Sequence, residues 1–262
     1  MSETISFPYL GLSFNVDKVA FTLFGISVRW YGVIIGVGIL AAFIYALYAV
    51  KTSELSQDDL LNMTIIALPC AIVGARLYYV IFNWDYYKDD LMGIFAIRNG
   101  GLAIYGGIIA AAIVIIVYCK CKKIKLGAPF DLLAVGLPIA QSIGRWGNFV
   151  NGEAYGGHTS LPIAMSIGNY AKCVHPTFLY ESLWNAAGVI IILLIKRKGK
   201  LKNRLFCVYM IWYGIGRFFI EGMRTDSLYL GVFRISQIVS LAIIALGIGI
   251  LIYFKYKKED KI

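Results

Sequence analysis

Long apolar runs are the feature that most constrains how this chain of 262 residues can fold. A helix that crosses a bilayer needs about 20 predominantly apolar residues. Only 15% of the residues are charged, whereas a soluble domain is nearer a quarter charged. The sequence therefore predicts an all-α membrane protein with about seven transmembrane helices in one integral-membrane domain over 1–262. The expected spans are 28–50, 61–82, 101–119, 129–147, 178–195, 205–222 and 235–254.

The range 129–147 is the weakest of these spans. Pro138 interrupts it, and Gly136 and Gly144 flank the proline. A broken helix is tolerated in a membrane where neighbouring protein satisfies the freed backbone groups, so we expect a break here. The following segment, 148–176, is rich in Gly, Asn and His. We expect it to re-enter the bilayer or to cap a cavity, because lipid leaves bare backbone unsatisfied.

The basic residues predict the orientation and explain the net charge of +10. They cluster in the loops that fall on one side of the seven spans, and such loops are cytoplasmic. The N-terminus is therefore expected outside and the C-terminus in the cytoplasm. The first residues lack a basic region and a cleavage site, so we expect no signal peptide. Short basic clusters between apolar runs are typical of membrane proteins, and we expect no nucleic-acid partner.

The five cysteines predict neither a metal site nor a disulfide framework. No pair has the spacing Cys-x-x-Cys, and the chain holds only two histidines as additional ligands. Zinc sites need three or four such ligands at characteristic spacing. We therefore expect no metal.

The sharpest group of polar residues inside an apolar run lies in the range 205–222. Tyr213, Arg217 and Glu221 are spaced four apart, so they form one stripe along a helix. Arg217 and Glu221 can pair at i, i+4. Charges inside spans are costly and usually functional. The alternative is a structural ion pair that orients the helices.

A second polar group follows the weakest span. Arg145 lies at its end, and Asn148, Asn151 and Glu153 come next, followed by Gly156. Arginine suits a phosphate through its forked donors, and glycines let backbone N–H groups approach a ligand. The alternative is an ordinary interfacial loop.

Other polar residues lie near the ends of the expected spans, and here the alternatives remain open. Tyr105 lies between two Gly-Gly pairs in the run 98–107, whose glycines can also serve helix packing. Arg76 lies within the second span and needs an anionic partner, either structural or a ligand. His175 opens the fifth span one turn and a half before Glu181, so capping and catalysis are both open.

Two buried arginines with flexible glycine backbone describe a site for an anionic amphiphile near the outer surface. A phospholipid headgroup fits better than an inorganic ion, because the site opens onto lipid. A transporter or flippase for an anionic lipid or solute is the alternative, and it expects alternating access. The polar groups cluster on the outer side without a matching inner gate. A structural scaffold subunit would leave several buried charges unexplained.

The run from Gly144 to Glu153 closely resembles the signature of bacterial prolipoprotein diacylglyceryl transferases. Its letters are Gly-Arg-Trp-Gly-Asn-Phe-Val-Asn-Gly-Glu. The runs Gly-Gly-Leu-Ala-Ile-Tyr-Gly-Gly, His-Pro-Thr-x-x-Tyr-Glu and Tyr-Gly-x-x-Arg-x-x-x-Glu are similar to that family in the same order. The resemblance covers essentially the whole chain.

The resemblance implies a multi-pass enzyme of the bacterial cytoplasmic membrane. Such an enzyme transfers diacylglycerol from phosphatidylglycerol to the lipobox cysteine of a prolipoprotein signal peptide, which is the first step of lipoprotein maturation. A thioether forms and glycerol phosphate leaves, with no metal or redox cofactor. The implied catalytic residues are Arg145, Arg217, Tyr105, Glu153 and Glu221. The implied substrate contacts are Arg145, Asn148, Asn151, Gly156, Tyr31, Tyr213, Arg217, Arg76 and His175.

One position departs from the family pattern. Some members place a histidine, proposed as the base for the thiol, where this chain has Tyr105. A tyrosine hydroxyl is a poor base at neutral pH. Either Tyr105 serves as a hydrogen-bonding group, or deprotonation falls to another residue or to solvent. His175 is the imidazole candidate by topology.

Overall fold

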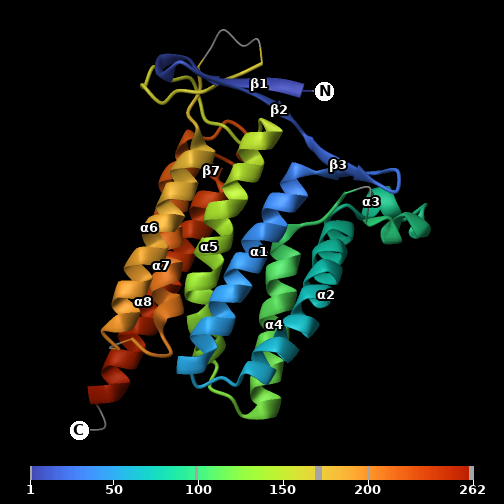
Figure 1. Cartoon of the computed structure of the whole chain (residues 1–262). Coiled ribbons are helices and arrows are strands. Elements are labelled where there is room, and N and C mark those ends of the chain that lie inside the picture. Colours follow the sequence, from blue (N-terminus) through green and yellow to red (C-terminus); the bar gives the residue numbers. More distant parts are fainter. Residues whose placement is uncertain (1, 98–99, 169–172, 200, 260–262) are drawn as a thin grey trace. The chain divides into compact units, whose positions relative to one another are not determined.

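The chain forms two compact units in a computed structural model (Figure 1). The structure describes residues 2–97, 100–168, 173–199 and 201–259. Unit 1 holds Met1–Ala46 and Phe130–Ile262, and unit 2 holds Leu47–Pro129. Arg98 and Asn99, which begin the glycine-rich run around Tyr105, lie outside the described residues. The expectation of one integral-membrane domain stays a prediction.

Seven helices of the described residues are 19 residues long or longer. Unit 1 contains most of α1 (Trp30–Ala49) and of α5 (Gly127–Asn151), together with α6 (Thr177–Arg197), α7 (Leu205–Met223) and α8 (Ile235–Glu259). Unit 2 contains α2 (Gln57–Phe82) and α4 (Ile104–Lys122). Shorter helices are α3 (Trp84–Tyr87), η1 (Pro8–Leu10), η2 (Val50–Thr52) and η3 (Leu91–Phe95).

Six of the described helices are long and apolar enough to cross a membrane. These are α1, α2, α4, α6, α7 and α8, and they confirm the prediction of a helical membrane protein. Helix α5 is long enough but falls outside this group of six. The count of seven spans and the orientation of the termini stay predictions.

The predicted break at Pro138 is wrong. Helix α5 runs without interruption from Gly127 to Asn151, and Pro138 lies inside it with its side chain fully buried. A proline removes only one helical donor and crowds one carbonyl. Around it, Ala134 and Val135 of α5 pack in one buried cluster with Ile192 of α6 and with residues of α7. This packing holds the helix together across the proline.

An antiparallel sheet joins the N-terminus to the segment that follows α5. Its strands are β1 (Ser2–Phe7), β2 (Leu12–Asp17) and β5 (Ser166–Ile167), in the order β2-β1-β5. Ile5 of β1 pairs with Ile167 of β5, and both pack on Phe178 at the start of α6. Strand pairing with β1 thus satisfies backbone groups of Ser166 and Ile167 in the glycine-rich segment.

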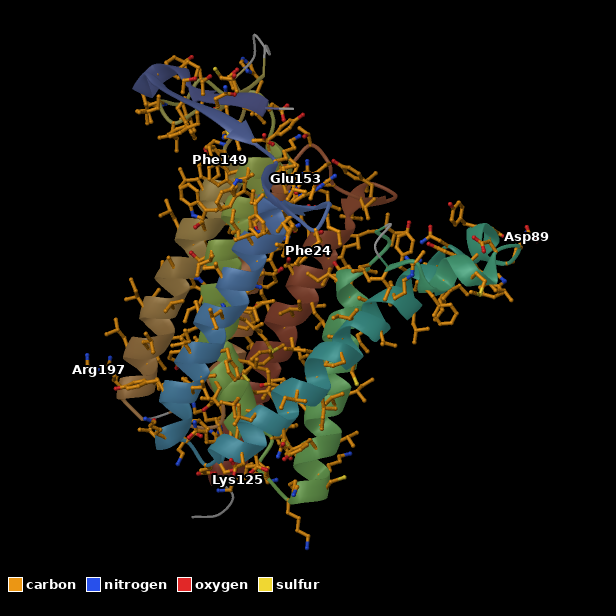
Figure 2. The ribbon with its side chains drawn as sticks, turned by 45° about the vertical axis from the view of Figure 1, so that its right-hand side comes forward. Phe24, Asp89, Lys125, Phe149, Glu153 and Arg197 are labelled. Carbon is orange, nitrogen blue, oxygen red and sulfur yellow. The ribbon has the colours of Figure 1, made fainter. Side chains whose placement is uncertain are left out.

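Two further hairpins lie beside the membrane helices. The first joins β3 (Val19–Leu23) to β4 (Ile26–Arg29), and the second joins β6 (Tyr229–Leu230) to β7 (Phe233–Arg234). Phe24 is at the tip of the first hairpin, exposed and in the left-handed region with φ 48° (Figure 2). Strand β4 leads directly into α1, so this hairpin lies at the end of a spanning helix.

Two tryptophans hold α6 against α7. The rings of Trp184 and Trp212 stack with centroids 4.3 Å apart. Each indole Nε1 donates to the backbone carbonyl of the other tryptophan, at 3.0 and 2.9 Å. Gly188 and Gly216 make room for the rings, since a β-carbon at Gly188 would lie 2.6 Å from Trp212. We call Trp184 and Trp212 the tryptophan pair.

Candidate functional site

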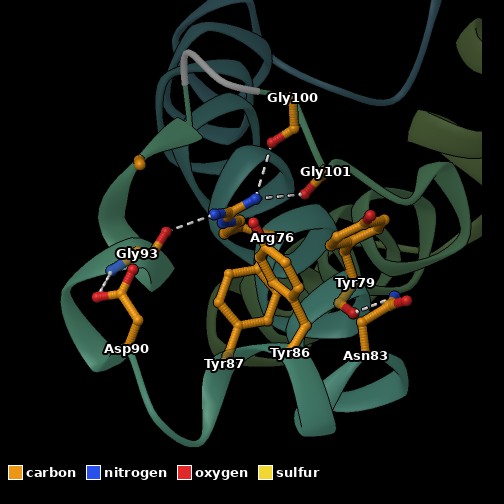
Figure 3. Close-up of a pocket in the computed structure, with 10 residues that line it drawn as sticks. Arg76, Tyr79, Asn83, Tyr86, Tyr87, Asp90, Gly93, Gly100 and Gly101 are labelled. Atoms are coloured by element: carbon orange, nitrogen blue, oxygen red, sulfur yellow. Dashed lines mark hydrogen bonds between the residues drawn. The ribbon is translucent and has the colours of Figure 1, made fainter.

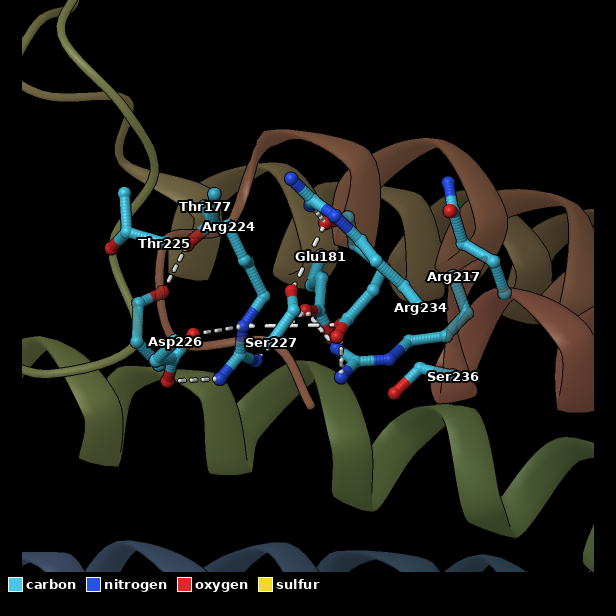
Figure 4. A network of polar contacts seen from close by, with 12 residues as sticks. Thr177, Glu181, Arg217, Arg224, Thr225, Asp226, Ser227, Arg234 and Ser236 are labelled. Atoms are coloured by element: carbon cyan, nitrogen blue, oxygen red, sulfur yellow. Dashed lines mark hydrogen bonds and ion pairs between the residues drawn. The ribbon is translucent and has the colours of Figure 1, made fainter. Parts of the chain in front are cut away.

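A buried carboxylate, Glu181, lies at the centre of the polar residues of unit 1 (Figure 4). Its Oε2 lies 2.5 Å from Nη2 of Arg145 on α5. Its Oε1 lies 2.8 Å from Nη1 of Arg217 on α7. The Glu181 side chain is 5% exposed, and those of the two arginines are 23% and 16% exposed. One carboxylate from α6 therefore joins two guanidinium groups from two other helices.

The predicted pairing along α7 is confirmed. Arg217 Nη2 lies 2.6 Å from Oε2 of Glu221, four residues further along the helix. Glu221 is almost fully buried, and its backbone carbonyl accepts a hydrogen bond from the guanidinium of Arg234. Tyr213 lies one turn before Arg217 and stacks on Tyr209, with ring centroids 5.7 Å apart. The stripe therefore runs from an aromatic stack to the ion pairs.

Arg224, just after α7, extends the network to the surface. Its Nε and Nη2 donate to the two carboxylate oxygens of Asp226 at 2.9 and 2.7 Å. Its Nη1 also lies 3.8 Å from Oε1 of Glu181. The hydrogen bonds from Arg224 lower the pKa of Asp226 below its ordinary value, so Asp226 carries its charge at neutral pH.

The polar residues around the end of α5 are connected to the same arginines. Arg145 Nη1 donates to Oδ1 of Asn148 at 3.2 Å. The Nδ2 groups of Asn148 and Asn151 both donate to Oε1 of Glu153, each at 3.1 Å. Figure 2 shows Glu153 at one end of unit 1, with Arg197 at the other. Glu153 is exposed, so this chain of hydrogen bonds leads from the buried ion pairs to the surface.

Gly156 fixes the loop between α5 and α6 against the end of α7. Its backbone N–H donates to the carbonyl of His175 at 3.0 Å, and it forms a bridge with Arg224. A β-carbon at Gly156 would lie 2.7 Å from Cβ of His175, so only glycine fits. The His175 ring lies within hydrogen-bonding distance of the Tyr180 hydroxyl, Nδ1 to O, at 3.2 Å.

Tyr31, near the start of α1, packs on α5. A β-carbon at Gly147 would lie 2.9 Å from its Cδ2, so the ring rests against the glycine. Gly147 lies between Arg145 and Asn148 in the sequence, which places Tyr31 beside the α5 part of the network. The structure therefore brings Arg145, Asn148, Asn151, Glu153, Gly156, His175, Arg217, Glu221, Tyr31 and Tyr213 into unit 1.

Arg76 and Tyr105 belong to unit 2. Arg76 is buried, and its guanidinium donates to four backbone carbonyls, those of Gly93, Ile94, Gly100 and Gly101, at 2.7 to 3.0 Å (Figure 3). Among the described residues, its partners are thus carbonyl groups and not the anion expected from the sequence. These contacts engage four of its five donors and favour a structural role.

Arg76 lines a cavity of about 320 Å³. Tyr79, Tyr86 and Tyr87 line it, and the guanidinium carbon of Arg76 lies 5.2 Å from the centre of the Tyr87 ring. Such a contact between a cation and a ring face is attractive. Tyr105 lies in the first turn of α4 and is 45% exposed.

Several members of the network were not expected from the sequence. Spacing along the sequence assigns no role to Glu181 and does not distinguish Arg224, Asp226 or Arg234. The signal for Arg224 is its place seven residues after Arg217 on the same helical face. Glu181 carries the weaker signal of an acidic residue in the first turns of an apolar helix. Its partners depend on how three helices pack, which spacing alone does not give.

Three arginines and three carboxylates form the ion pairs of the network. Arg145, Arg217 and Arg224 face the carboxylates of Glu181, Glu221 and Asp226. Arginine has five N–H donors. Among the described residues, Arg145 and Arg217 each use two of them for Asn148, Glu181 and Glu221. Each of these two arginines therefore has three further N–H donors beside the two that these contacts use.

Comparisons with known proteins identify relatives along nearly the whole chain. The family model described as prolipoprotein diacylglyceryl transferase matches residues 18–253. A phosphatidylglycerol–prolipoprotein diacylglyceryl transferase of Finegoldia magna is 48% identical over 245 residues, which cover 93% of this chain and 97% of the relative. The protein of the same name from Clostridioides difficile is 44% identical over 247 residues, which cover 94% and 99%. That from Listeria monocytogenes serotype 4b is 45% identical over 265 residues, which cover 94% and 95%.

Proposed function

This chain belongs to the prolipoprotein diacylglyceryl transferase family, and from that premise we propose that it transfers the diacylglyceryl group of phosphatidylglycerol to the lipobox cysteine of prolipoproteins. The observation that carries the proposal is the joint contact of Arg145 and Arg217 with Glu181. Both guanidinium groups are held beside each other and keep donors for a phosphate. Arginine binds phosphate strongly through such paired donors.

The reaction is an alkyl transfer. The cysteine thiolate attacks the glycerol carbon that carries the phosphate ester, a C–S bond forms, and the C–O bond breaks. The electron pair of that bond leaves with the phosphate oxygen, so glycerol phosphate gains one negative charge. Donors aimed at a developing charge stabilise the transition state. Arg145 and Arg217 provide those donors in this proposal, and Glu221 holds Arg217.

The polar side chains near the end of α5 suit the glycerol headgroup. Asn148 and Asn151 donate to Glu153, which is exposed and accepts both hydrogen bonds at one oxygen. Amide and carboxylate groups together can donate to and accept from hydroxyl groups. We assign these three residues to the headgroup, Tyr31 and Tyr213 to the lining of the site, and Gly156 to the packing of the nearby loop against the end of α7.

The thiol must lose its proton before or during attack, because the thiolate is the nucleophile. Tyr105 replaces the histidine of some family members, and we assign its hydroxyl a hydrogen-bonding role. His175 is the imidazole of unit 1 that lies beside Gly156, and it is the candidate acceptor for the proton. We assign Arg76 to the support of the loop that lines its cavity, and not to substrate binding.

We place the protein in the bacterial cytoplasmic membrane with its N-terminus outside. The loops expected on the cytoplasmic side hold 15 of the 25 basic residues. In that orientation, Arg145 and Arg217 face the outer leaflet. Phosphatidylglycerol and the signal peptide of a secreted prolipoprotein both reach that side of the membrane.

A purified-component assay tests the proposal. The protein in vesicles that contain phosphatidylglycerol is mixed with a lipobox peptide, and release of glycerol phosphate is measured together with the peptide mass. We expect glycerol phosphate in equal amount to a peptide heavier by one diacylglyceryl group. A peptide with serine in place of the cysteine serves as the control. Folded protein that lipidates neither peptide refutes the proposal.

A further inference from the structure

Glu181 holds an unusual position for an acidic residue in a site that binds an anion. It is nearly fully buried, and it lies on α6 between Arg145 of α5 and Arg217 of α7. Its two carboxylate oxygens are divided between the two guanidinium groups, Oε2 to Arg145 and Oε1 to Arg217. The carboxylate therefore fixes the separation of two arginines that no backbone element connects directly.

Charge alone does not explain this residue. A buried carboxylate beside a phosphate site repels the phosphate and offsets the attraction of the arginines, because like charges interact strongly away from water. An uncharged residue would leave the site more positive and would bind an anion more tightly. The contribution of Glu181 to a phosphate site must therefore be geometric.

The surroundings of Glu181 hold it rigidly. Its backbone carbonyl accepts a hydrogen bond from Nδ2 of the buried Asn185 at 2.9 Å. The tryptophan pair, which includes Trp184 one turn along α6, fixes that helix against α7. On the other side, Ser182 donates to the carbonyl of Ser142 on α5 at 2.8 Å. Contacts to both neighbouring helices therefore lie directly beside the carboxylate.

We propose that Glu181 is a positioning residue that sets the spacing of Arg145 and Arg217, so that their remaining donors meet one phosphate group as it leaves. This inference rests on the proposed function. Donors placed before the reaction stabilise developing charge without reorganisation, and small displacements are costly. Glu181 acts through the two arginines. Its negative charge weakens the binding of the phosphate in the ground state, and its contacts keep the two guanidinium groups aligned.

The variant Glu181→Gln separates alignment from attraction. The amide keeps the shape of the side chain, and its oxygen can still accept from one arginine. Its –NH2 group is a donor and faces the donors of the other arginine, which is released. The loss of a buried negative charge leaves the site more attractive to phosphatidylglycerol. We expect kcat to fall by about 10²-fold while KM for phosphatidylglycerol does not rise.

The experiment compares the full-length wild type, E181Q and the control E54Q in vesicles with increasing phosphatidylglycerol content and a fixed, saturating lipobox peptide. Glu54 pairs with Lys125 at 3.1 Å in unit 2 and is a matched Glu-to-Gln change outside the network. We expect E54Q to keep the wild-type kcat and KM. An unchanged kcat in folded E181Q overturns the inference, and so does any rise in KM. If the wild type itself releases no glycerol phosphate, the proposed function has failed and not the role of Glu181 alone.

A second variant, Glu181→Asp, covers the case in which E181Q does not fold. Aspartate keeps the charge but is shorter by one methylene, so it cannot reach both guanidinium groups from the same backbone position. We expect kcat to fall for E181D as well, with KM unchanged. Wild-type kcat in E181D, or failure of both variants to fold, shows that Glu181 serves only the assembly of the helices and overturns the inference.

Discussion

Arg217 on α7 lies 2.8 Å from the carboxylate of Glu181 on α6, measured from Nη1 to Oε1. The same guanidinium pairs with Glu221 on its own helix. Two carboxylates from different directions thus leave Arg217 only one orientation that satisfies both. A fixed guanidinium is what a phosphate site requires, since flexible donors must be ordered when the anion binds.

Replacement of either phosphate-binding arginine is expected to abolish turnover. We expect Arg145→Ala and Arg217→Ala each to lower the rate of glycerol phosphate release by at least about 10²-fold, because each removes a donor to the leaving phosphate. The amount of protein in the membrane fraction should stay near that of the wild type. Arg197→Ala, an exposed change at the opposite end of unit 1, is the control. Near-normal rates in either arginine variant contradict the phosphate role.

We expect the hydroxyl of Tyr105 to form one hydrogen bond in the reaction and not to act as the proton acceptor. Such a bond contributes about 1 kcal/mol, so we expect Tyr105→Phe to lower kcat by about tenfold or less. The dependence of kcat on pH should keep its shape, because the Tyr105 hydroxyl is not the proton acceptor in this proposal. The measurement is glycerol phosphate release between about pH 6 and pH 9, a range that includes the ordinary pKa of a cysteine thiol. A fully active Tyr105→Phe removes the hydroxyl from the reaction altogether.

Two adjacent glycines predict unequal effects of the same substitution on stability. A β-carbon at Gly156 would lie 2.7 Å from Cβ of His175 and 2.9 Å from the carbonyl of Met223. At Gly157 nothing lies within 4 Å. We expect Gly156→Ala to lower the free energy of unfolding by about 1–3 kcal/mol, and Gly157→Ala to leave it nearly unchanged. Thermal unfolding in detergent measures both, and equal effects would contradict the predicted clash.

The pair of Arg224 and Asp226 predicts a small stability effect that depends on pH. Hydrogen bonds from Arg224 lower the pKa of Asp226 in the folded protein, so the folded state binds a proton less readily than the unfolded state. The stabilisation is complete above the ordinary aspartate pKa of about 3.9, and it is lost as pH falls through the lower folded value. Half of the Asp226 side chain is exposed, so solvent weakens the effect.

The measurement for this pair is the difference in Tm between the wild type and Asp226→Asn. We expect a constant difference from neutral pH down to about pH 5, and a decreasing one below about pH 4. The variant Asp85→Asn, in an exposed pair with Lys88 in unit 2, is a control with little expected effect. A difference that grows as the pH is lowered contradicts the assigned direction of the pKa change.

Local spacing predicted those parts of the site that lie on one helix. The pairing of Arg217 with Glu221 follows from a separation of four residues, and the structure confirms it. Spacing along the sequence does not predict contacts between helices. The partner of both arginines is Glu181, whose role appears only when three helices are packed together. Asp131 of α5 also depends on how the helices pack, because its carboxylate accepts hydrogen bonds from the backbone N–H groups of Asn203, just before α7, and of Leu205, the first residue of α7.

The sequence also contains a strand pattern that a search for long apolar runs does not detect. Residues 4–7 and 12–17 alternate between polar and apolar side chains, a pattern typical of strands such as β1 and β2. The pairing of β1 with β5, about 160 residues later, has no such local signal. At Pro138 the rule that proline breaks helices gave the wrong result, because burial against α6 and α7 outweighs one lost hydrogen bond.

Substitutions at the tryptophan pair should depend on substitutions at Gly188 and Gly216, the two glycines that face its rings. Gly188 faces the ring of Trp212, and Gly216 faces the ring of Trp184, so neither glycine can gain a side chain while its tryptophan remains. Loss of one indole also leaves the other ring without its stacking partner. Tolerated substitutions at these positions should therefore occur in combination, and a lineage that changes one of the four should carry a compensating change at another.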